Sequence, residues 1–158
     1  MKLRSVPVCV ILLLAMIGCA DTDPGQMSEA DVRATGEVIH DAVITIDSHV
    51  DISFDFATES VDPLNGVRQV NLQNMRAGGL DVGFFNVFVR QTERTPENYA
   101  QAKTDAMTKF DAIHRMVDEM YPDLIELAYS ADDVERIHSS GKLVAAIGIE
   151  NGYVIGND

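Results

Sequence analysis

The sequence is poor in cysteine, and this shortage limits the chemistry that it can support. Its 158 residues include two cysteines, Cys9 and Cys19, and Cys9 lies in an N-terminal segment that we expect to be removed. The mature chain then keeps at most one cysteine, at its own N-terminus. This excludes a disulfide framework and, beyond the leader, a cysteine-based metal site or nucleophile. Any metal ion must therefore be bound by histidine, aspartate and glutamate.

Basic residues are also scarce. The chain has 12 Lys and Arg residues against 25 Asp and Glu residues, so its formal net charge is −13. Nucleic-acid phosphates require a basic surface, and this chain offers the opposite. We therefore expect no nucleic-acid partner. The acidic balance is compatible with solubility and with metal binding but specifies neither.

The apolar run near the N-terminus is too short to cross a membrane. Residues 6–17 are almost uniformly apolar and follow the basic Lys2 and Arg4. A spanning helix needs about 20 apolar residues, whereas this shorter length is typical of the central region of a signal peptide. We therefore predict that residues 1–19 are an export signal and that the chain leaves the cytoplasm.

The end of this leader resembles a bacterial lipobox. Met16-Ile17-Gly18-Cys19 places a small residue directly before the cysteine that would become lipidated. We predict a lipid on Cys19, which anchors the protein to the membrane, followed by a polar tether over residues 20–27. Because Ala20 rather than aspartate follows the cysteine, we expect the outer membrane rather than another periplasmic face in a Gram-negative host. The alternative is a plain signal cleaved after Ala20, with no lipid.

Beyond the tether, segments with helical and strand patterns alternate. The clearest is a helix that Thr95-Pro96 opens and Pro122 ends, because its apolar residues recur at steps of three and four. The expected helices cover residues 28–39, 72–77, 96–121 and 130–140, and the expected strands cover residues 43–46, 82–89, 124–128 and 143–149. Repeated strand–helix–strand units with continuously apolar strands predict an α/β fold, with a parallel sheet and helices on its faces.

Two polar segments lie at the carboxyl ends of expected strands, where such folds bind ligands. Asp47-Ser48-His49-Val50-Asp51 follows the strand expected to end at residue 46, and in extended backbone His49 and Asp51 point to the same side, about 6–7 Å apart. Glu150 follows another apolar strand and precedes Asn151-Gly152. Imidazole with carboxylates suits zinc, and a bridging carboxylate can hold two ions about 3.5–4 Å apart that activate a shared hydroxide.

The spacing of His49 and Asp51 is by itself a weak signal, because such pairs arise often by chance. A capping or hydrogen-bonding pair is the alternative, and the strand-end placement of both segments moves the balance toward a metal site. The other histidines, His40, His114 and His138, follow or lie on helices amid charged residues. We expect them to be solvated helix histidines rather than ligands, because a barrel site draws on strand ends.

Several motifs occur in an order that is typical of one enzyme family. They are Asp47-Ser48-His49-Val50-Asp51, Arg76-Ala77-Gly78-Gly79 before a strand, Tyr121-Pro122-Asp123 with Ala128-Tyr129-Ser130-Ala131-Asp132-Asp133-Val134, and Gly148-Ile149-Glu150-Asn151-Gly152-Tyr153 with Ile155-Gly156-Asn157. Together they resemble the membrane (renal-type) dipeptidases, metallopeptidases of the amidohydrolase-like TIM-barrel class. The similarity runs over residues 43–158.

The resemblance implies a zinc-dependent dipeptidase, in which a hydroxide activated by two Zn²⁺ ions hydrolyses the peptide bond of a dipeptide. His49 and Asp51 would bind one ion, and Glu150 would bridge both ions and serve in catalysis. A homodimer is compatible with the resemblance. Where some members have Gly-Gly-His after the glutamate, this chain has Asn151-Gly152-Tyr153, so the adjoining loop has a different shape.

Family members are more than twice as long and take further histidines, an arginine and an aspartate from later strands. These have no counterpart here, so we expect a truncated sequence that is inactive alone. Residues 28–158 would be the N-terminal portion of a TIM-type (β/α)8 barrel. Two alternatives stay open: another metal hydrolase of the amidohydrolase superfamily, such as a cyclic amidase or phosphoesterase, and a non-catalytic lipoprotein remnant.

Overall fold

The computed structural model describes residues 27–68 and 70–156. The predicted leader, the lipidation site Cys19 and nearly all of the tether lie outside these residues, so they stay predictions. Within the described part, no helix is both long and apolar enough to span a membrane.

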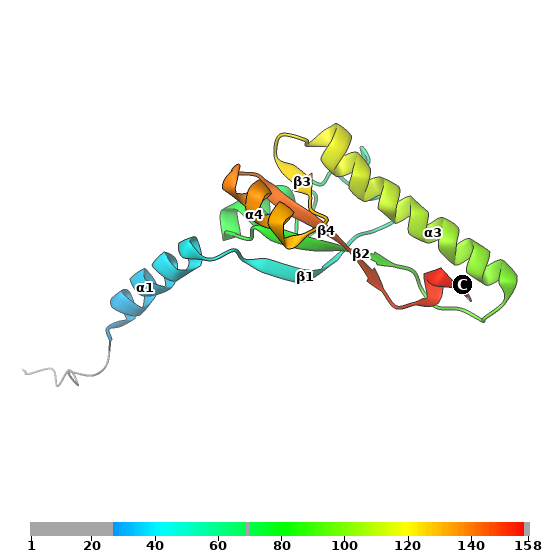
Figure 1. Ribbon diagram of the computed structural model, residues 1–158, viewed down its shortest axis with the longest axis horizontal. Helices are drawn as coiled ribbons and strands as arrows, with labels where there is room; N and C mark the ends of the chain where they lie inside the picture. The colour runs from blue at the N-terminus through cyan, green and yellow to red at the C-terminus, as the bar shows by residue number, and fades with distance from the viewer. Residues whose placement is uncertain (1–26, 69, 157–158) are drawn as a thin grey trace, which may run out of the picture.

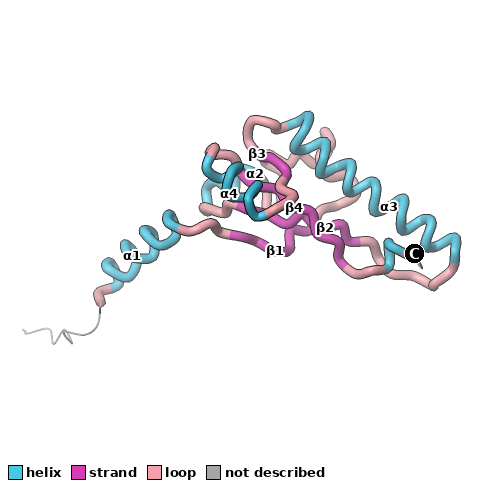
Figure 2. Tube along the Cα trace, viewed as in Figure 1, coloured by secondary structure: helices cyan, strands magenta, loops and turns pink. Residues whose placement is uncertain are grey.

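Four parallel strands form one sheet (Figures 1 and 2). They are β1 (Ile46–Asp51), β2 (Val82–Phe88), β3 (Ile125–Leu127) and β4 (Leu143–Glu150), arranged in the order β1-β2-β4-β3. Asp51, Asn86 and Gly148 are register partners on three neighbouring strands, so the carboxyl ends of β1, β2 and β4 meet at one edge. This confirms the parallel α/β sheet that the sequence predicts, and it is consistent with part of a TIM-type barrel.

Helices cover both faces of the sheet. One face carries α2 (Leu72–Gly78), α3 (Pro96–His114) and η1 (Arg115–Met120), a π-helix that continues α3, whereas α4 (Ala131–Ser139) covers the other. On that second face Ile137 shares a buried cluster with Val82 and Val144. The strand order explains this division. The chain moves across the sheet in one direction from β1 to β2 to β3, and it moves back from β3 to β4. Because each crossover is right-handed, the helix of the backward step, α4, lies on the opposite face from the helices of the forward steps.

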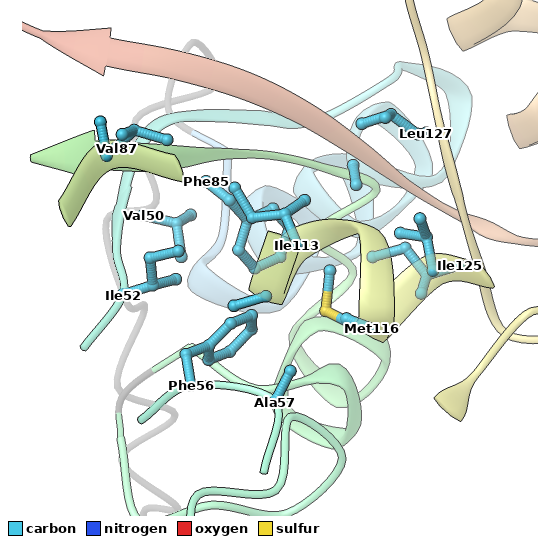
Figure 3. Close-up of a cluster of buried hydrophobic side chains, with 14 of the residues drawn as sticks. Val50, Ile52, Phe56, Ala57, Phe85, Val87, Ile113, Met116, Ile125 and Leu127 are labelled. Carbon is cyan, nitrogen blue, oxygen red and sulfur yellow. The ribbon is translucent and has the colours of Figure 1, made fainter. Parts of the chain in front are cut away.

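The main core lies between the sheet and the helices α2 and α3. Val50 from β1 and Phe85 from β2 point into it, and Ile113 from α3 and Met116 from η1 meet them there (Figure 3). Because side chains alternate along a strand, the burial of Val50 turns its neighbours toward the opposite face of β1. The core therefore determines which way the predicted ligands point.

Side-chain caps mark where most helices begin. Ser28, Thr95 and Ser130 each accept a hydrogen bond from the backbone N–H three residues further on, as their sequence context predicts. The first of these caps opens α1 (Glu29–Ala42), which has no buried residue and extends away from the sheet (Figure 1). At the end of α2, Gly79 takes the left-handed conformation that glycine favours, with φ of 66°.

The first strand begins later than the sequence suggests. Residues 43–46 were the expected strand, whereas Ile46–Asp51 pairs with β2. Thr45 is fixed to the turn before β2, since its N–H donates to Asp81 Oδ2 at 2.9 Å and its hydroxyl donates to the Gly79 carbonyl at 2.6 Å. The expectation was wrong because a strand with one solvated face need not be apolar. The polar motif of residues 47–51 therefore lies in the strand rather than after it.

Candidate metal centre

Three predicted ligands converge at the carboxyl edge of the sheet. His49 and Asp51 come from β1 and Glu150 ends β4, with β2 lying between these two strands. His49 Nε2 lies 3.5 Å from Asp51 Oδ1 and 3.2 Å from Glu150 Oε2. One ligand atom from each residue lies within 4.8 Å of the others. The structure thus brings together all three residues that the sequence predicts as metal ligands.

An irregularity in β1 helps to aim His49. The register with β2 shifts between Asp47 and Val50, and the Asp47 carboxylate accepts a hydrogen bond from the His49 N–H at 2.9 Å. Such offsets commonly re-aim side chains beside active sites. Here Val50 stays in the core while the His49 imidazole reaches toward Glu150 across the width of β2.

The two separations from His49 fit ligands of one tetrahedral zinc ion. Two ligands that each lie about 2.0–2.1 Å from the same ion at a tetrahedral angle are about 3.3–3.4 Å apart. The observed 3.5 Å between His49 and Asp51 and 3.2 Å between His49 and Glu150 fall on either side of this value. One imidazole and two carboxylates are also donors that zinc accepts. These side chains could therefore hold an ion without a large rearrangement.

The site opens to solvent on one side. The His49 and Asp51 side chains are 52% and 63% exposed, and they line a hollow of about 400 Å³ together with Val67 and Arg68 from the loop after β1. A larger apolar hollow of about 620 Å³ lies between α4 and the sheet, but none of the three predicted ligands lines it. The smaller hollow is therefore the one that belongs to the candidate metal centre.

Two cations from the helix layer hold the loop that leaves β1. Lys109 of α3 is 5% exposed and its Nζ donates to the Ile52 carbonyl at 2.6 Å, directly after Asp51. Burial lowers the pKa of Lys109, and the nearby Asp51 carboxylate opposes that shift. Arg115 of η1 donates from Nε to the Ala57 carbonyl at 2.6 Å. Both bonds anchor the chain next to the candidate ligands.

A third contact to this loop gives a pH-dependent prediction. The Tyr121 hydroxyl donates to Asp62 Oδ1 at 2.5 Å, and this bond together with burial raises the pKa of Tyr121 to about 12 from 10.0. Its stabilisation is then fully present below pH 10 and is lost as the pH rises through 12. We expect Tyr121→Phe to lower the free energy of unfolding by about 1–2 kcal/mol at pH 7. Urea unfolding between pH 7 and 12 should show that the deficit shrinks with pH. A deficit that is constant up to pH 12 would contradict this assignment.

The other histidines lie apart from this cluster. His114 Nδ1 lies 3.2 Å from Asp118 Oδ2, and His138 Nε2 lies 3.5 Å from Asp81 Oδ1. The His40 ring lies against Gly79. Among the described residues, none of the three belongs to the group that could hold a metal.

Two residues near the site were missed in the sequence, although each left a signal. Lys109 falls on the buried stripe of α3, at three- and four-residue steps from Ala106 and Ile113. Lysine is rarely buried without a partner, so its place there indicates a specific contact. Asn86 bears the one polar side chain of β2, and it is 4% exposed.

The fold and the site together define a class of protein. A parallel α/β sheet that gathers one histidine and two carboxylates at its strand ends is consistent with part of a TIM-type barrel that carries a metal site. The family model described as membrane dipeptidase (peptidase family M19) matches residues 33–158. The chain therefore belongs to the membrane dipeptidase family, and the resemblance seen in the sequence is confirmed.

Individual relatives agree with this family. The chain is 31% identical over 93 residues to the dipeptidase ataJ of Aspergillus terreus and 29% identical over 92 residues to the dipeptidase tcpJ of Claviceps purpurea. Each match covers 56% of this chain but 22% and 21% of the relatives. The crystal structure of the probable dipeptidase PvdM from Pseudomonas aeruginosa matches with a TM-score of 0.72 at 24% identity, over 83% of this chain and 34% of that one. The chain thus spans about a fifth of the curated relatives and about a third of the solved structure.

Proposed function

We propose that this chain supplies part of a binuclear zinc centre in a dipeptidase. The observation that carries the proposal is the convergence of His49, Asp51 and Glu150 across β2, in a member of a dipeptidase family. His49 and Asp51 would hold one Zn²⁺, and Glu150 would be a ligand shared by the two ions. The substrate is a dipeptide, and the reaction is hydrolysis of its peptide bond.

The protein residues hold and neutralise the metal centre. Bound zinc polarises a carbonyl oxygen and lowers the pKa of water toward 7, so hydrolysis needs no serine or cysteine nucleophile. Asp51 and Glu150 would supply the negative charge that offsets the bound cations. His49 would bind through Nε2, the atom that faces both carboxylates. An open hollow of about 400 Å³ lies beside His49, Asp51 and Arg68.

The remaining ligands would come from sequence outside these 158 residues. Each zinc ion takes about four ligands, and three side chains cannot satisfy two ions. The matched segments amount to 22% and 21% of the two curated relatives, which leaves ample sequence in a protein of that length for the rest of a barrel. We infer that residues 28–158 are the N-terminal part of that barrel and that they are inactive alone.

Metal removal tests the proposed function. We expect a chelator to abolish dipeptide hydrolysis by the full-length protein and Zn²⁺ to restore it, with about two zinc ions bound per chain. Cyclic amides and phosphoesters assayed in parallel distinguish a dipeptidase from other hydrolases of the superfamily. Hydrolysis that survives chelation, or a full-length protein that binds no zinc, would refute the proposal.

The location of the protein is a separate proposal, supported by the lipobox-like run that ends at Cys19. In cells we expect lipid-modified, membrane-associated protein, at the outer membrane in a Gram-negative host. Metabolic labelling with a fatty-acid analogue should mark the wild type and leave Cys19→Ser unlabelled. Label that persists in Cys19→Ser would disprove the anchor.

A further inference from the structure

One buried side-chain amide lies on the face of the sheet that carries the candidate metal centre, and nothing in its contacts explains its burial. Asn86 lies near the carboxyl end of β2, in register with Asp51 on β1 and Gly148 on β4. Its side chain is 4% exposed, and its Nδ2 donates no hydrogen bond within the described part of the chain. A buried donor without a partner costs free energy, so its presence calls for an explanation. An aliphatic residue of similar size would fill this position without that cost.

The neighbouring strand leaves room for this amide. Asn86 Oδ1 occupies the place that a Cβ at position 148 would take, so Gly148 is what allows the side chain to lean over β4. Glycine inside a strand weakens the strand and often marks a close approach of this kind. Asn86 and Gly148 therefore form a matched pair.

The side-chain amide of Asn86 is oriented so that its donor, Nδ2, points away from β4. Oδ1 and Cγ are the atoms of Asn86 that lie within 4 Å of the position of a Cβ at Gly148, and Nδ2 lies further away. Oxygen and nitrogen diverge from the same carbon, so with the oxygen over β4 the nitrogen is directed away from β4. The register partner on β1 is Asp51, whose carboxylate belongs to the candidate metal centre.

The geometry points to Asn86 as a positioning residue, which donates from Nδ2 to the Asp51 carboxylate when a cation draws His49, Asp51 and Glu150 together. This inference rests on the proposed metal site. Carboxylates that bind metals are themselves held by hydrogen bonds from outer-shell groups, and loss of such a group typically weakens metal binding by about 10–100-fold. Asn86 supplies that bond, and Gly148 gives it the space to do so.

The first test compares Zn²⁺ affinity with the stability of the metal-free protein. In the full-length protein, Asn86→Leu keeps the branched shape and the number of heavy atoms but removes the donor. We expect its Zn²⁺ affinity, measured by competition with a chromophoric chelator, to fall about 10–100-fold. Its metal-free stability in urea should be unchanged or higher, because an unpartnered donor is gone. Unchanged affinity in Asn86→Leu would overturn the inference.

A double-mutant cycle tests the pairing with Gly148. Gly148→Ala should weaken Zn²⁺ binding by a similar factor in the wild type, because the new methyl group displaces Asn86, but by less than about 2-fold in the Asn86→Ala background. Gly83→Ala is the matched control, since this strand glycine faces the core and should leave the affinity unchanged. Equal effects of Gly148→Ala in both backgrounds would refute the pairing. A wild type that binds no Zn²⁺ would instead refute the proposed function.

Discussion

Replacement of Glu150 by glutamine should remove most of kcat for dipeptide hydrolysis in the full-length protein. Glutamine keeps the size of the side chain but loses its charge, so two cations would face one another with less compensation. Glu150 Oε2 lies 3.2 Å from His49 Nε2, so the change also disturbs the neighbouring ligand. The loss should reach at least the roughly 10–100-fold that removal of an outer-shell partner causes. Steady-state kinetics and metal analysis measure it, with bound zinc falling toward one ion or none.

His49→Ala and Asp51→Ala should act in the same direction, because each removes one ligand from one ion. His114→Ala is the matched control. Its imidazole is 44% exposed and faces Asp118 rather than the metal ligands, so neither rate nor metal content should change appreciably. Circular dichroism should show an intact fold in all four variants. Near-normal activity in Glu150→Gln, or zinc lost with His114→Ala, would overturn the assignment of the site.

Local signals in the sequence are sufficient for most elements of the fold. Thr95-Pro96 opens α3 and Ser130 opens α4 because a capping side chain satisfies backbone N–H groups whatever the distant chain does. The boundary of β1 could not be predicted in this way. Its residues are polar on the face that carries the site, and what makes them a strand is pairing with β2, a contact between distant segments.

The strand order is a second feature that local patterns do not contain. The sequence predicts parallel strands but not that β4 lies between β2 and β3, with α3 on one face of the sheet and α4 on the other. This order places Glu150 one strand away from β1, so that β2 separates the ligands. The two-residue spacing of His49 and Asp51 is enough to predict that both side chains lie on the same side of the strand. The contact of His49 with Glu150 depends instead on the strand order and on the register shift within β1.

The residues that support the candidate metal centre lie outside the sequence motifs. Lys109 sits in a helical pattern and Asn86 in a strand pattern, and each is the polar exception among apolar neighbours. In a folded protein such exceptions persist where a specific contact offsets the cost of burial. Lys109 makes that contact with the Ile52 carbonyl, next to a candidate ligand. A polar residue at an otherwise apolar position of a helix or strand is therefore a usable sign of a residue that supports the ligands of a site.

We expect the largest effect on stability from a truncation of Ile113, which belongs to the same core cluster as residues of the loop after β1. Ile113 is fully buried and shares the main core with Val50, Phe85 and Met116 (Figure 3). Ile113→Ala removes buried methyl groups and leaves a cavity, which should cost about 2–5 kcal/mol of the free energy of unfolding. That is a large share of the roughly 5–15 kcal/mol by which domains are stable. Urea unfolding of the full-length protein measures it.

Met107→Ala is the matched control on the same helix. Met107 is 50% exposed, so its truncation should change the free energy of unfolding by no more than about 0.5 kcal/mol. Ile113 lies one turn from Lys109 and close to Arg115, the two cations that hold the loop after β1. A loosened α3 should therefore also weaken Zn²⁺ binding in Ile113→Ala and leave it unchanged in Met107→Ala. Equal destabilisation by the two truncations would mean that α3 does not hold the core in the way these contacts indicate.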